Sequence, residues 1–176
     1  TAARRRAGVR IALALGLGER AVELARKVAP ALAESARRGF LAELAQDGEE
    51  AGLPAVSLWA YRTLRATGGP AREDRVLDQR IAASALAAGD TATALEAQTR
   101  LARALEPGSP ARRRVVADLI RVEAGRADAE TLFRRLEGFR SEFPDAPELD
   151  ALASAVAAGL RARGQGDDAV RALRGV

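Results

Sequence analysis

The chain has 176 residues, of which 48% are hydrophobic and only 3% aromatic, so alanine, leucine and valine carry most of the apolar content. It contains no cysteine and no histidine, which excludes a disulfide framework, thiolate chemistry and the commonest general base and metal ligand. The 28 cations, nearly all arginine, face 24 anions and leave a formal net charge of +4. This composition favours closely packed helices and argues against a β-sheet.

Short polar breaks containing a glycine recur along the chain. They contain Gly16, Gly52, Gly89, Gly125 and Gly164, at spacings of 36, 37, 36 and 39 residues. Each break separates two Ala/Leu-rich stretches whose apolar residues recur at intervals of three and four, as in amphipathic helices. A break at this period indicates one helix pair repeated about five times.

The predicted helix pairs follow from these breaks in chain order. We expect helices at about 2–15 and 19–29, 32–47 and 54–66, 72–88 and 91–105, 110–124 and 127–142, and 148–163 and 167–174. Pro54 and Pro110 suit first helical positions, and Asp90, Ser109 and one of Asp167 and Asp168 suit N-caps. The repeat units then cover about 2–31, 32–69, 70–108, 109–146 and 147–176 of a single repeat domain, 1–176. Because the chain begins at Thr1, we expect it to be a fragment of a longer protein.

The last unit carries the residues that resemble a known family. It has apolar and small side chains at fixed offsets from the glycine: Val156, Ala157, Leu160, Gly164, Ala169, Val170, Leu173 and Val176. This pattern resembles the tetratricopeptide repeat (TPR), and the other units match it less completely. The resemblance implies an all-α, right-handed superhelical solenoid of about five helix pairs. In this family the first helices of the pairs line a concave groove that binds a peptide or a partner helix.

The source and compartment are only partly indicated. Heavy use of arginine and alanine is typical of a GC-rich bacterial genome, and the segment Phe139–Pro147 resembles junctions in bacterial envelope members of the family. Both the bacterial cytoplasm and the periplasm or cell envelope stay open as compartments.

The resemblance also implies partner-binding residues. Carrying the groove positions of the family over to this chain gives Arg6, Arg10, Gln46, Gln79, Arg114, Asp118, Arg121 and Arg161, with Glu49, Glu50, Val76, Leu86 and Ser154 on the same surface. Arg114 and Arg121 lie two turns apart on one helix face, and Arg161 could join them to hold a carboxylate of an acidic partner. The alternative interpretation is an ordinary solvated face.

Other conspicuous residues have two interpretations each. The run Arg112–Arg114 lies in a first helical turn, where the helix dipole disfavours cations, so it either serves a partner or reflects the general use of arginine. Trp59 and Tyr61 are expected in the core, as are the four phenylalanines at positions 40, 133, 139 and 143.

The function predicted from the sequence is a non-catalytic scaffold that binds a protein or peptide, with no catalytic residue, cofactor or metal. The alternative is a structural repeat segment that self-associates through the C-terminal helix (Val170, Leu173, Val176) or stacks on further repeats. Nucleic acid is not favoured as a partner, because the basic residues are dispersed and aromatic residues are scarce. No stretch of the chain is long and apolar enough to be a transmembrane segment.

Overall fold

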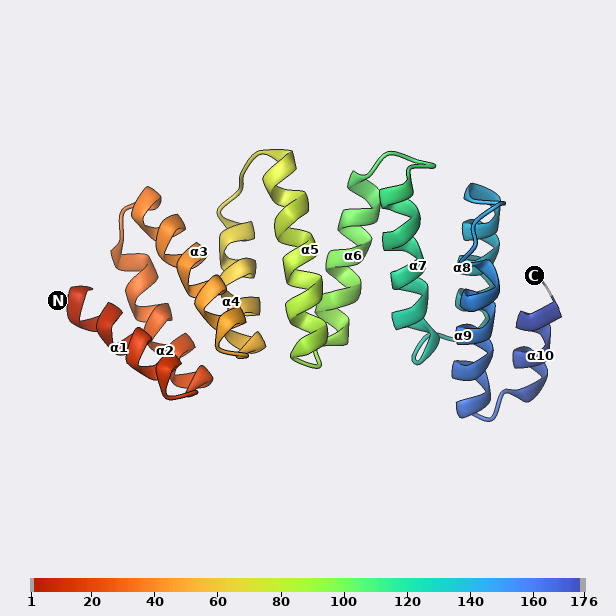
Figure 1. The fold of residues 1–176 in the computed structure, drawn as a ribbon, viewed down its shortest axis with the longest axis horizontal. Helices are drawn as coiled ribbons and strands as arrows, with labels where there is room; N and C mark the ends of the chain where they lie inside the picture. The colour runs from red at the N-terminus through yellow and green to blue at the C-terminus, as the bar shows by residue number, and fades with distance from the viewer. Residues whose placement is uncertain (1, 175–176) are drawn as a thin grey trace. The chain divides into compact units, whose positions relative to one another are not determined.

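The structure is a computed structural model that describes residues 2–174, and in them the regular structure is ten α-helices and one short 3-10 helix. The predicted all-α repeat fold is confirmed, with five successive helix pairs (Figure 1). Two compact units, residues 1–97 and 98–176, divide the chain inside α6. The helices are α1 (Ala2–Ala14), α2 (Gly18–Val28), α3 (Glu34–Glu50), α4 (Pro54–Ala66), α5 (Ala71–Ala87), α6 (Thr91–Ala104), α7 (Pro110–Ala124), α8 (Ala129–Glu142), α9 (Leu149–Ala162) and α10 (Gly166–Arg174).

The turns inside the helix pairs explain the glycine period. The backbone φ angle is positive at four of the five periodic glycines, namely 70° at Gly16, 66° at Gly52, 75° at Gly89 and 77° at Gly164. Side chains other than glycine rarely adopt this left-handed conformation, so each turn selects glycine. The turn between α7 and α8 differs. Gly125 has a φ of −80°, and the Asp128 side chain caps α8 by accepting from the Thr131 N–H.

Unit 1 is built on helix pairs that pack along their lengths. In it, α1 packs on α2, α3 on α4, α4 on α5, and α2 on α4. Its largest fully buried side chains include those of Val28, Leu41 and Leu44. Gly48 lets α3 and α4 approach closely, because a Cβ at this position would lie 2.7 Å from Ser57 Oγ and 3.0 Å from Ser57 N.

Unit 2 has its own core. In this unit α7 packs on α8 and α9, and α9 packs on α10. Ile120, Leu132, Leu152 and Leu160 are fully buried there. The ring of buried Phe139 tilts against that of Phe143, with centroids 5.1 Å apart, a favourable aromatic geometry.

Most predicted caps are confirmed and a few boundaries were wrong. Pro54 and Pro110 begin α4 and α7, Ser109 accepts from the Arg112 N–H, and Asp90 accepts from the Thr93 N–H. Residues 29–31, which include Pro30, form the 3-10 helix η1 (Ala29–Ala31), so α3 begins two residues later than expected and ends three residues later. The prediction that Asp167 or Asp168 is an N-cap was wrong. Since α10 begins at Gly166, both lie inside its first turn, where the helix dipole favours anions.

The half-buried carboxylate of Glu142 links the end of α8 to the start of α7. Glu142 Oε1 accepts from the Gly108 N–H at 3.0 Å and from Arg112 Nε at 2.7 Å. Burial alone would raise the pKa of Glu142, but these hydrogen bonds outweigh it and lower the pKa below its ordinary value of 4.5. The ionised carboxylate therefore stabilises the fold above about pH 4.5, and this contribution is lost as the pH falls through the lower folded-state pKa.

We expect Glu142→Gln to lower the free energy of unfolding by about 1–2 kcal/mol at pH 7, because the charge-assisted hydrogen bonds become neutral ones. The difference from the wild type should shrink as the pH falls from about 4.5 through the lower folded-state pKa of Glu142, because the wild-type side chain then becomes neutral, as glutamine already is. Urea unfolding at a series of pH values measures this difference in the free energy of unfolding. A difference that stays constant down to acidic pH would show that the ionised form is not what stabilises the turn.

Candidate functional site

A groove in unit 1 runs between α3 and α5, with a volume of about 780 Å³. Small residues, Gly39 and Ala42, lie on its α3 side, and Val76 and Leu77 lie on its α5 side. Val76 is an exposed apolar side chain at 52% of its maximal area. The groove thus offers apolar surface that the unit itself leaves uncovered. Its other lining residues are Arg38, Gln46, Glu49, Glu50, Tyr61, Leu64, Glu73 and Arg80.

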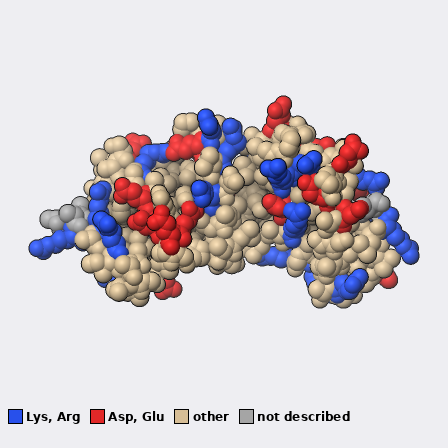
Figure 2. Space-filling model, in the orientation of Figure 1, with Lys and Arg blue, Asp and Glu red and all other residues tan. Residues whose placement is uncertain are grey.

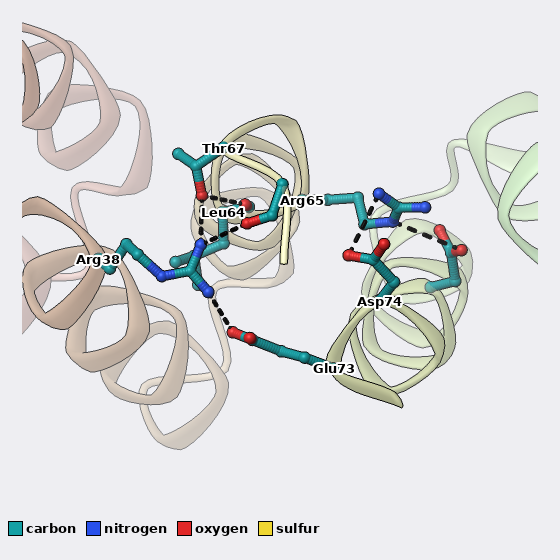
Figure 3. A network of polar contacts seen from close by, with 8 residues as sticks. Arg38, Leu64, Arg65, Thr67, Glu73 and Asp74 are labelled. Atoms are coloured by element: carbon teal, nitrogen blue, oxygen red, sulfur yellow. Dashed lines mark hydrogen bonds and ion pairs between the residues drawn. The ribbon is translucent and has the colours of Figure 1, made fainter. Parts of the chain in front are cut away.

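Arg38 closes one end of this α3/α5 groove and is held by several acceptors (Figure 3). Its Nη1 donates to Thr67 Oγ1 at 2.6 Å and to the Gly68 carbonyl at 2.8 Å, and its Nη2 pairs with Glu73. The Thr67 hydroxyl in turn donates to the Leu64 carbonyl at 2.7 Å. This network fixes the turn between α4 and α5, so the guanidinium of Arg38 acts within the chain.

Arg65 makes a second link across the same turn (Figure 3). Its guanidinium lies 3.3 Å from Asp74 Oδ1 and 3.6 Å from Asp78 Oδ2. Asp78 is only 3% exposed. A carboxylate this buried needs a nearby cation, so Arg65 ties α4 to α5 at the point where the groove is formed.

Glu49 organises the other end of the groove. Arg80 Nη1 lies 3.3 and 3.4 Å from its two carboxylate oxygens. Burial raises the pKa of Tyr61, and donation of its hydroxyl to the Glu49 carboxylate raises it further. Arg80 and the Tyr61 hydroxyl are thus both donors to Glu49, and Tyr61 stays protonated at neutral pH.

A second groove in unit 1 lies between α1 and α3, with a volume of about 800 Å³. The Arg6 guanidinium lies 5.6 Å from the centroid of the Phe40 ring, a cation–π distance. Ile11 lines the groove and is 61% exposed. Glu43 and Asp47 of α3 face Arg6 and Arg10 of α1 across it. Both grooves use first helices of the pairs, and α3 lies between them.

Comparison with known proteins identifies structures with a similar fold. No family model matches the chain, and no curated protein matches it. Two crystal structures of the nearly identical TPR-like repeats of a kinesin light chain candidate from Podosopora anserina match over 97% of this chain and 90% of theirs. They are 18% identical in sequence, with TM-scores of 0.59 and, for a single-residue variant of those repeats, 0.58. The fold is TPR-like. This confirms the predicted resemblance at the level of architecture.

The predicted partner-binding residues of α1 and α3 line two different grooves of unit 1. Arg6 and Arg10 line the α1/α3 groove, and Gln46 lines the α3/α5 groove, where it donates to Glu50 Oε1 at 2.9 Å. Glu49 and Glu50 also line the α3/α5 groove. Gln79 is exposed on α5 outside the lining of the groove.

In unit 2 the predicted residues lie on two first helices. Arg114, Asp118 and Arg121 are exposed on α7, and Arg161 is exposed in the last turn of α9. Arg121 Nη1 pairs with Asp118 Oδ1 at 2.6 Å, so part of the predicted positive charge is neutralised within the helix.

The structure favours the ordinary interpretation of the Arg112–Arg114 run. Arg112 pairs with Glu142 and also donates to the Ala102 carbonyl, and Arg113 Nε lies 3.4 Å from Glu148 Oε1. Two of these three arginines thus serve the packing of unit 2, and of the three only Arg114 is exposed. Sequence reasoning could not detect the two ion pairs, because Glu142 and Glu148 lie 30 or more residues from their arginines.

The positions of the two aromatic residues of α4 were predicted only in part from the sequence. Trp59 and Tyr61 pack against the core of unit 1, as predicted, but both are half-buried. Tyr61 lines the α3/α5 groove, while Trp59 lines a third groove, of about 740 Å³, between α2 and α4. The sequence signal for this α2/α4 groove is the presence of apolar residues on opposite faces of α4. Phe133 is also half-buried, with the Arg171 guanidinium 4.6 Å from its ring centroid.

Among the described residues, no group of three or more Asp, Glu, His or Cys side chains is arranged to hold a metal ion. Within that same part of the chain, no helix has the length and apolarity needed to cross a bilayer.

Proposed function

We propose that this chain is a non-catalytic scaffold that binds a peptide segment of another protein in the α3/α5 groove. The observation that carries the proposal is the open, apolar lining of this groove, with small residues on one side and exposed Val76 on the other. Concave sites with a mostly apolar lining and a few polar groups are typical of binding sites. TPR-like folds are generally protein-interaction modules, and residues 1–176 would work as one such repeat domain.

Peptide selection with a blocked variant tests this proposal. Random peptides displayed on phage are selected on the wild-type chain and then measured against Ala42→Trp, which places a large ring on the groove floor. Ala42 is exposed, so the substitution should leave the fold intact. The matched control is Ala55→Trp, an equally exposed alanine that lines the α2/α4 groove instead. We expect Ala42→Trp to lose most of the bound peptides and Ala55→Trp to retain them. Selected peptides that bind both variants equally, or no selected peptides at all, would contradict the proposal.

The acidic-partner hypothesis belongs to unit 2. We propose that Arg114, Arg121 and Arg161 contact carboxylates of a partner segment there, since all three are exposed on first helices. The pairing of Arg121 with Asp118 weakens this support, because a partner carboxylate would have to compete with it.

Self-association through α10 is the second candidate function. Val170 and Leu173 are each 46% exposed on this helix, although Val176 lies outside the described residues. An apolar pair of this kind can stack on another repeat or another copy. Sedimentation over a range of concentrations should show a dimer that Leu173→Asp abolishes. A wild-type chain that stays monomeric at high concentration would exclude self-association.

A further inference from the structure

We propose that the α3/α5 groove selects a partner segment in which a lysine or arginine lies beside an apolar side chain. The basic group would lie at the C-terminal end of α3, and the apolar side chain would lie between Gly39, Ala42 and Val76. This inference rests on the proposed function and adds the chemistry of the partner. It differs from the acidic partner proposed for unit 2.

The charge at the end of α3 is the first support. The last turn of this helix contains Asp47, Glu49 and Glu50, and no basic residue. Of these acids, Glu49 and Glu50 line the α3/α5 groove, whereas Asp47 lines the α1/α3 groove. The C-terminus of a helix carries partial negative charge from its free carbonyl groups, so anions are unfavourable there. Figure 2 shows acidic side chains gathered over the region of α3. A cationic side chain from a partner would relieve this repulsion.

The second support is that the arginines of the groove are occupied. Arg38 is held by Glu73, Thr67 and the Gly68 carbonyl at the far end of the groove. Arg80 contacts both carboxylate oxygens of Glu49. Glu50 is exposed and accepts a hydrogen bond from the neutral amide of Gln46, which leaves its charge in place. The acid that faces the groove opening is therefore available to an incoming cation.

The third support is the floor of the groove. Gly39 lies inside α3, where glycine is less favourable than alanine. A Cβ at Gly39 would meet nothing within 4 Å, so packing within the chain does not require a glycine there. Because Gly39 has no side chain, the floor of the α3/α5 groove stays open next to Ala42. Thus an unfavourable glycine and an unfavourable cluster of acids occur on the same helix, and both suit an apolar and basic ligand.

The test uses the pool of displayed peptides that bind the wild-type chain and lose binding to Ala42→Trp. We expect these peptides to be enriched in lysine or arginine next to an apolar residue. Their affinity should fall about two- to fivefold for Glu50→Gln, as expected for the loss of one exposed ion pair. The matched control, Glu34→Gln, removes an exposed acid from the first turn of the same helix and should bind the peptides as the wild type does.

Thermal unfolding of the free variants separates a binding role from a structural one. The Glu50→Gln chain should unfold at the same temperature as the wild type or higher, because it loses an unfavourable charge at a helix C-terminus. A lower unfolding temperature would show that Glu50 serves the fold and would overturn the proposal. Groove-dependent peptides without basic residues, or peptides that bind the Glu50→Gln chain unchanged, would also overturn it while leaving the proposed function standing. A pool with no groove-dependent peptide would contradict both.

Discussion

Replacing Gly159 by alanine should destabilise unit 2 by about 3 kcal/mol, because the added methyl group collides with the backbone of a neighbouring helix. A Cβ at Gly159 in α9 would overlap the carbonyl oxygen of Ala124, the last residue of α7, and would lie 2.6 Å from the carbonyl carbon. Rigid backbone cannot move aside as a flexible side chain can. The Ala124 carbonyl also accepts from Arg163 Nη1 at 2.9 Å, so a shift of α7 would disturb this hydrogen bond as well.

Gly138 in α8 offers the matched control for this substitution. It also lies inside a helix of unit 2, but a Cβ there meets nothing within 4 Å. We expect Gly138→Ala to raise the free energy of unfolding by about 0.5–1 kcal/mol, the ordinary advantage of alanine over glycine in a helix. Urea unfolding followed by circular dichroism measures both variants. A Gly159→Ala chain as stable as the wild type would show that α7 and α9 do not approach each other this closely.

The second large effect concerns Arg65 in unit 1. Arg65→Met should cost about 2–3 kcal/mol, because it removes a cation from beside Asp78, whose side chain is only 4% exposed. Methionine keeps most of the apolar volume of the arginine stem, so the loss reports mainly on charge. Asp74, 3.3 Å from the same guanidinium, loses its partner at the same time.

Arg62→Met provides the control for Arg65→Met on the same helix. Arg62 is exposed, one turn before Arg65, and its replacement should change the free energy of unfolding by less than about 0.5 kcal/mol. Both variants are measured by urea unfolding at neutral pH. Equal effects of the two substitutions would mean that Asp78 does not depend on Arg65.

The helix pairs could be predicted from the sequence because their turns impose a local requirement. A left-handed backbone conformation selects glycine, so Gly16, Gly52, Gly89 and Gly164 mark the period directly. Gly125 keeps the same spacing but does not adopt this conformation. Here the cap by Asp128 sets the start of α8, two residues later than expected. The start of α3 was missed because Pro30 supports a 3-10 turn, which shows no helical period.

The candidate site could be predicted only in part, because its character depends on contacts between distant residues. The resemblance placed Arg6, Arg10 and Gln46 on groove surfaces, and the structure shows them there. The sequence did not show which charged side chains form ion pairs with one another within the chain. Arg38 meets Glu73 only because α3 and α5 flank a common groove. The acidic residues at the end of α3 are visible in the sequence. Whether they are available to a partner could be judged only from the structure, in which Arg80 pairs with Glu49.

Site-specific photo-crosslinking tests the α3/α5 groove as the binding surface most directly. A photoreactive amino acid replaces Val76, which lines the groove and is 52% exposed, or Leu86, which lies on the same helix, is 43% exposed and does not line it. Peptides selected on the wild-type chain, with no step that favours any groove, serve as ligands. We predict strong crosslinking from position 76 and little from position 86. Equal crosslinking from both positions, or crosslinking from position 86 alone, would contradict a binding site in this groove.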